Sequence, residues 1–129
     1  MDFNIEIEFV KKHIKKEYQD RLLFELQSQK HREKAISRFS HNSEKILKNG
    51  FKCCNILDLK TYLFNVYDSK KKCYVISNDE NDGKMFLVSD AIEYLMCSYM
   101  TMILISENFV VVKEEYEKSP MILISTESH

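Results

Sequence analysis

Residues 101–125 read TMILISENFVVVKEEYEKSPMILIS, with three apolar runs separated by polar residues. Each run is four residues long and rich in the aliphatic and β-branched side chains typical of strands. These runs predict strands over Thr101–Ser106, Phe109–Glu115 and Met121–Ser125. Glu107 and Asn108 leave only enough chain between the first two strands for a hairpin turn. This part of the chain should therefore form a β-meander.

The segment before the meander predicts one further strand and a helix. Cys73–Ser77 is rich in strand-forming residues, and Ser89 is a suitable N-cap for a helix over 89–98. Strand, helix and strand in this order indicate a βαβ crossover, which is right-handed if the two strands are parallel. The sheet should then be mixed, and a terminal strand at its edge could pair with a second copy of the chain to form a homodimer.

The N-terminal half favours helices. Apolar residues recur at helical spacing at Phe3, Ile7, Val10, Ile14 and Tyr18, although the first residues also alternate as a strand would. A later helix turns Ala35, Ile36 and Phe39 inward and breaks near 40–42, and Gly50 is well placed as a stop signal. We therefore predict an α+β fold for residues 1–129, taken as a single domain. Its helical N-terminal half packs on a small three- to five-stranded mixed sheet formed by the C-terminal half.

Composition excludes several chemistries. The chain has 129 residues but only two glycines, Gly50 and Gly83, so it has no Walker A loop, GxGxxG turn or GxSxG elbow. The four cysteines form no CxxC pair, and the histidines form no HExxH motif. The polar stretch 78–83 resembles the start of a calcium loop, but Ser89 stands where the closing glutamate would be needed.

These exclusions lead to expectations about catalysis, cofactors and the cellular compartment of the protein. The sequence singles out no catalytic residue, metal ligand or cofactor, and it favours a protein without catalysis over an enzyme. The N-terminus lacks the basic start and apolar stretch of a signal peptide, and the longest apolar runs have four residues. We therefore expect a cytoplasmic protein with reduced cysteines and no membrane partner.

Charge is distributed unevenly along the chain. Residues 1–78 contain sixteen basic and ten acidic side chains, whereas residues 79–129 contain three basic and ten acidic ones. The two parts therefore have net charges of +6 and −7. The candidate partner-binding residues of the acidic part are Asp79, Glu80, Asp82, Glu107, Glu114, Glu115 and Glu117. An acidic surface of this kind steers a basic partner toward the protein.

Three hypotheses for function follow. The leading one is a small non-catalytic protein-interaction module, for example an immunity protein or an antitoxin, that binds a basic protein through the acidic surface. The first alternative is a nucleic-acid-associated regulator that uses a basic helix over 30–45, whose face would present Lys34, Arg38, His41 and Lys45. The second is a small enzyme or ligand-binding domain with a pocket near Arg38, His41 and the Cys73–Ser77 strand.

Overall fold

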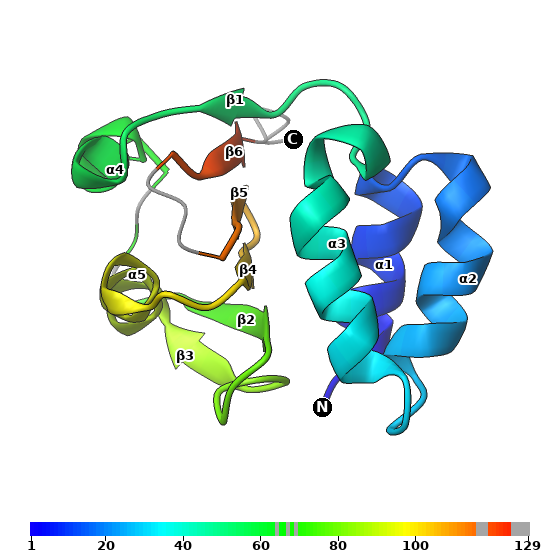
Figure 1. Cartoon of the computed structure of the whole chain (residues 1–129). Helices are drawn as coiled ribbons and strands as arrows, with labels where there is room; N and C mark the ends of the chain where they lie inside the picture. The colour runs from blue at the N-terminus through cyan, green and yellow to red at the C-terminus, as the bar shows by residue number, and fades with distance from the viewer. Residues whose placement is uncertain (64, 67, 69, 116–118, 125–129) are drawn as a thin grey trace.

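Three layers make up the structure, with helices on both faces of one sheet (Figure 1). The computed structural model describes residues 1–63, 65–66, 68, 70–115 and 119–124. Its helices are α1 (Phe3–His13), α2 (Lys16–Leu26), α3 (Arg32–Ile46), the short α4 (Leu59–Tyr62) and α5 (Val88–Cys97), with a 3₁₀ turn at Ile56–Asp58. Its strands are β1 (Lys52–Cys53), β2 (Lys72–Ser77), β3 (Met85–Leu87), β4 (Met102–Ile105), β5 (Phe109–Lys113) and β6 (Met121–Ile124). Within these residues, no helix is both long enough and apolar enough to cross a bilayer.

The fold class predicted from sequence is confirmed, but the sheet differs in detail. Its strand order is β1-β6-β5-β4-β2-β3, so it has six strands rather than three to five. Every neighbouring pair of these strands is antiparallel, whereas a mixed sheet was expected. The terminal strand β6 is not at an edge either, because β1 pairs with its outer side. The edge strands of the sheet are β1 and β3.

The predicted βαβ crossover is wrong because the sequence reading missed strand β3. Strand β3 folds back on β2 as a hairpin, with Cys73 opposite Phe86. The chain therefore reverses once more before α5, and β4 returns antiparallel to β2. Helix α5 also begins one residue before Ser89, with Leu87 at the N-cap position. The three residues of β3 are too few to show a clear period-two pattern.

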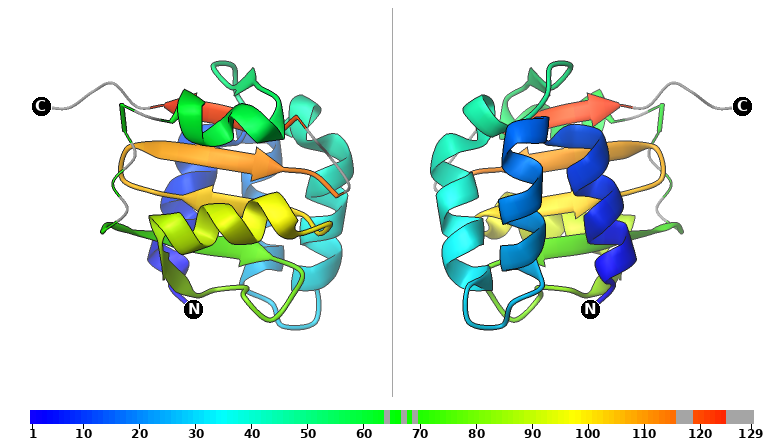
Figure 2. Two further views of the ribbon diagram at one scale, coloured as in Figure 1. Left: turned by 90° about the vertical axis from the view of Figure 1, so that its left-hand side faces the viewer. Right: turned by 90° about the vertical axis from the view of Figure 1, so that its right-hand side faces the viewer.

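Two hydrophobic cores form, one on each face of the sheet. Helices α1, α2 and α3 pack over Tyr74, Ile76, Ile103 and Val112, whereas α5 packs over the opposite face (Figure 2). Because both faces are covered, all five residues of β5 are buried. This explains why the strands of the meander appear as continuous apolar runs rather than alternating ones, a pattern usual for sheets covered on both sides.

The buried face of the first helix includes the predicted Val10 and Ile14 but is shifted slightly from the predicted stripe. Asp2 caps α1 by accepting hydrogen bonds from the backbone N–H groups of Asn4 and Ile5. The buried residues of α1 are Glu6, Phe9 and Val10, while Phe3 is exposed. The expected apolar stripe therefore lies slightly off the true buried face, because a glutamate occupies an interior position that hydrophobicity alone does not reveal.

Candidate functional site

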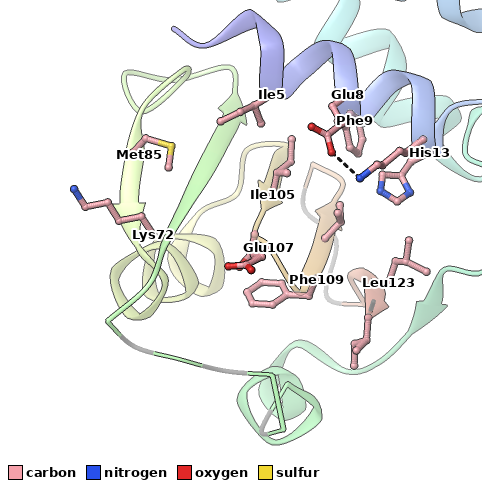
Figure 3. Close-up of a pocket in the computed structure, with 14 residues that line it drawn as sticks. Ile5, Glu8, Phe9, His13, Lys72, Met85, Ile105, Glu107, Phe109 and Leu123 are labelled. Atoms are coloured by element: carbon pink, nitrogen blue, oxygen red, sulfur yellow. Dashed lines mark ion pairs between the residues drawn. The ribbon is translucent and has the colours of Figure 1, made fainter. Parts of the chain in front are cut away.

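A groove of about 710 Å³ lies between helix α1 and the end of the sheet where β4 turns into β5 (Figure 3). We call it the α1 groove. One wall consists of α1 residues Ile5, Glu8, Phe9, Lys12 and His13. The floor and opposite wall come chiefly from Lys72, Met85, Ile105, Glu107, Val110 and Leu123. Residues 70 or more positions apart in the sequence thus line one cavity, and no local motif predicts it.

The floor follows a single row of side chains across the sheet. Strand pairing places these residues directly opposite one another in the order Met85, Tyr74, Ile105, Val110, Leu123. At the strand spacing of about 4.8 Å, a row across five strands is roughly 19 Å long. Tyr74 is buried, but Ile105 and Leu123 are only partly covered and Met85 is 48% exposed. The helical layer therefore leaves part of an apolar row open at this end of the sheet.

Charged side chains border the groove on both sides. On the α1 side, Lys12 pairs with Glu8 at 2.6 Å, and both side chains are exposed. On the opposite side, Glu107 pairs with Lys71 at 2.9 Å. Lys72 is exposed and has no ion-pair partner among the described residues. An apolar floor with a charged rim suits a ligand that has one apolar and one polar face.

His13 closes the end of the groove nearest β6. Its ring contacts Phe9 and Phe51, with ring centroids 5.6 Å and 5.7 Å away. Burial lowers the pKa of His13, and the nearby charges of Lys12 and Lys48 lower this pKa further. These effects favour the neutral form of the imidazole. Its ring packs between two phenylalanine rings, one on α1 and one in the segment before β1.

The acidic candidates separate into two ends of the sheet. Asp79, Glu80 and Asp82 lie in the loop between β2 and β3, and Glu114 and Glu115 directly follow β5. Both groups lie at the same end of the sheet, because Ser77 is paired with Met102 and Met102 with Lys113. Glu107 lies at the other end, in the β4–β5 turn. Glu117 falls outside the described residues.

Asp82 belongs to an interior charge network that the sequence did not reveal. The Arg32 guanidinium donates to both carboxylate oxygens of Glu6 at 2.7 Å, and to those of Asp82 at 2.6 and 2.9 Å. It also donates to the Leu26 carbonyl, while the Tyr74 hydroxyl donates to Glu6. Burial lowers the pKa of Arg32, but the hydrogen bonds to Asp82 and Glu6 outweigh it and raise this pKa above its usual value. Asp82 is therefore already paired inside the protein, although one guanidinium shared with Glu6 cannot neutralise both carboxylates.

The predicted basic face is interrupted. Lys34, His41 and Lys45 are exposed, but Arg38 forms an ion pair with Glu25 of α2. Asn42 has non-helical backbone angles, which confirms the predicted break and divides the face into two. Arg38 and Lys45 line a second groove of about 400 Å³ between α2 and α3. Neither His41 nor any residue of the Cys73–Ser77 strand lines this second groove, so it does not join the residues of the expected pocket.

The four cysteines are free thiols in different surroundings. Cys73 is buried, whereas Cys97 is exposed. Cys97 ends α5, so its side chain lies beyond the last buried turn. Burial raises the pKa of the Cys73 thiol to about 12. Among the described residues, no three histidine, cysteine or acidic side chains gather in a way that could hold a metal ion.

Cysteine alkylation at pH 8 should therefore be strongly selective. With a pKa of about 12, only about one Cys73 thiol in ten thousand is ionised at that pH, and the thiolate is the reactive form. Cys53 and Cys97 should react with iodoacetamide at least about a hundredfold faster than Cys73 in the folded protein. Peptide mass spectrometry over time measures the rates, and urea should abolish the difference. Equal rates without urea would contradict the buried position of Cys73.

The sequence matches no protein-family model, and comparison with curated proteins and with solved structures gives no match to the chain.

Proposed function

We propose that this protein is a non-catalytic interaction module that holds an amphipathic helix of a protein partner in the α1 groove. The observation that supports the proposal is the row of partly uncovered apolar side chains at Met85, Ile105 and Leu123. Partly uncovered apolar side chains in a groove rimmed by charge are typical of protein-binding sites. The neutral His13 ring adds further apolar surface at the end of the groove.

The dimensions of the groove suit a helix. The row runs across the strands, and α1 lies alongside it in the same direction, so a partner helix would pack parallel or antiparallel to α1 (Figure 2). A row of roughly 19 Å matches about 13 helical residues at 1.5 Å per residue. Such a helix would place side chains at i, i+3 or i+4, and i+7 on the floor.

Charge complementarity indicates which charged residue the partner helix should carry beside its apolar face. The ion pairs Glu8–Lys12 and Lys71–Glu107 leave Lys72 as the exposed, unpaired charge on the described rim. The partner helix should therefore carry an acidic residue beside its apolar face, where it meets Lys72. Attraction of a basic protein to Asp79, Glu80, Glu114 and Glu115, as in an immunity protein or an antitoxin, remains a separate prediction about the other end of the sheet.

Site-specific photo-crosslinking tests the groove directly. A photoreactive amino acid placed at Ile105 should attach, in native cell extract, to a partner segment with apolar residues at helical spacing. Met85→Glu places a charge on the floor and should lower the adduct yield at least about tenfold, which corresponds to 1.4 kcal/mol. The control is Leu57→Glu, because Leu57 is 79% exposed and lies outside the groove lining. Its adduct yield should stay within about twofold of the unmodified protein.

Two outcomes would contradict the proposal. One is attachment of the probe to partner segments without helical apolar spacing. The other is an adduct yield that Met85→Glu leaves unchanged. Circular dichroism of both variants establishes that the comparison is made between folded proteins.

A further inference from the structure

Two helix ends meet in a small backbone junction at one end of the helical layer. The Lys15 N–H donates to the Ile46 carbonyl, and the Lys48 N–H donates to the His13 carbonyl, both at 2.8 Å. An isolated antiparallel bridge between Ile14 and Leu47 lies between these two bonds. The junction lies between segments that carry lysines at the end of α1, the start of α2, the last turn of α3 and the chain that follows α3. We call this set the lysine cluster: Lys11, Lys12, Lys15, Lys16, Lys45, Lys48 and Lys52.

The lysine cluster has a large excess of positive charge. Segments 8–17 and 44–52 contain these seven lysines and only three glutamates, Glu8, Glu17 and Glu44. Within the described residues, Lys12 is the member of the cluster with an ion-pair partner, and that partner is Glu8. Two helix C-termini account for only about one unit of negative charge, so they balance a small part of the excess. The remaining charge is available to an anionic ligand.

Aromatic rings lie within the lysine cluster. Phe51 is half-buried between Lys48 and Lys52 in the sequence, and its ring meets His13 edge-on. Lys12 precedes His13 in the chain, and the Lys48 ammonium donates a hydrogen bond to the Lys11 carbonyl at 3.2 Å, so both lysines lie at this end of α1. Lysines around a partly exposed aromatic ring are the combination that single-stranded nucleic acids bind, since phosphates meet the charges and a base stacks on the ring. A membrane surface or a polyphosphate would use the charges alone.

We propose that the lysine cluster binds the phosphate backbone of a single-stranded nucleic acid, with one base stacked on Phe51. This site differs from the basic face of α3 at Lys34 and Arg38, since it combines segments from both sides of the helical junction. It shares Lys45 with that face, and Lys12 and His13 with the α1 groove, but it does not depend on the function proposed for that groove. Four phosphate contacts would make binding about fiftyfold weaker at 200 mM than at 50 mM salt.

Fluorescence anisotropy with a labelled oligothymidylate of about 15 nucleotides tests the proposal. The double variant Lys11→Glu/Lys48→Glu should bind at least about tenfold more weakly and show a shallower salt dependence. The matched control is Lys30→Glu/Lys34→Glu, which changes net charge equally at the other end of α3 and should bind within about threefold of the wild type. Lys16→Glu/Lys45→Glu is a second cluster variant, with the same expected loss, for use if the first is unfolded by circular dichroism.

Two further variants test whether base stacking on Phe51 contributes to binding and whether the α1 groove takes part in it. Phe51→Leu keeps an apolar side chain but removes the ring, so it should weaken oligothymidylate binding about fivefold and leave polyphosphate binding unchanged. Met85→Glu should leave oligothymidylate binding intact, which distinguishes this site from the α1 groove. Equal losses from the two charge-matched double variants would overturn the proposal. So would oligothymidylate binding no tighter than that of polyphosphate, or of vesicles containing anionic lipid.

Discussion

Replacing Arg32 with methionine is expected to lower the free energy of unfolding by about 3–5 kcal/mol, as removal of one partner from a buried ion pair does. Arg32 is the only cation hydrogen-bonded to Glu6 and Asp82 within the described residues. Glu6 is 1% exposed, so its carboxylate would remain buried without a counter-charge. Methionine occupies much of the arginine volume, which keeps the cavity contribution small. Urea unfolding at pH 7 measures the change.

A matched arginine on the same helix provides the control. Arg38→Met removes an ion pair with Glu25, but Arg38 is more exposed and Arg21 lies 3.5 Å from the same carboxylate. We expect this change to cost about 1 kcal/mol or less. A double-mutant cycle of Arg32→Met with Glu6→Gln should show a coupling of at least about 1 kcal/mol. A loss below 1 kcal/mol for Arg32→Met would show that the network contributes little to stability.

The second large effect is expected for Lys113→Met, a loss of about 2–4 kcal/mol. Lys113 is fully buried in β5, and its ammonium group donates to the carbonyls of Ser98 and Met100 at 2.8 Å. These carbonyls belong to the segment that leaves the C-terminal end of α5, so the lysine ties this helix end to the sheet. Methionine fills the space but donates no hydrogen bond, which leaves two carbonyls without this partner.

Thermal and urea unfolding of Lys113→Met should be compared with those of Lys84→Met. Lys84 is exposed beside the edge strand β3, so its replacement should change stability by no more than about 0.5 kcal/mol. Lys113→Arg keeps a hydrogen-bond donor at this position. It therefore tests whether the loss of stability in Lys113→Met comes from the lost hydrogen bonds rather than from changed packing of the methylene groups. If Lys113→Met is as stable as Lys84→Met, the carbonyls of Ser98 and Met100 must be satisfied in another way.

The interior charge network also bears on the docking hypothesis drawn from sequence. Carboxylates concentrated in residues 79–129 suggested one acidic surface, but Asp82 is paired with Arg32, and Glu107 pairs with Lys71 at the opposite end of the sheet. Asp79, Glu80, Glu114 and Glu115 remain together at one end. Counting charges along the sequence cannot distinguish a paired carboxylate from an unpaired one, because Arg32, the partner of Asp82, is 50 residues away in the chain.

The strands show which secondary structure local sequence predicts and which it misses. Thr101–Ser106, Phe109–Glu115 and Met121–Ser125 were predicted within one or two residues of β4, β5 and the described part of β6, because each is a dense run of strand-forming side chains. The two-residue β1 and the three-residue β3 were missed, since such short segments have no measurable period. Missing β3 also reversed the expected direction of β4 relative to β2.

The residues alone determined the fold class, the strands of the meander and the break in α3, because these depend on side-chain preferences within a few positions. Tertiary structure decided which charges are buried, where the α1 groove opens and which lysines lie at the helix junction. Each of these features joins residues that are distant in the chain, such as Glu6 with Arg32, Ile5 with Leu123, and Lys15 with Ile46. The free energy of such contacts depends on packing and dielectric surroundings that exist only once the layers have assembled.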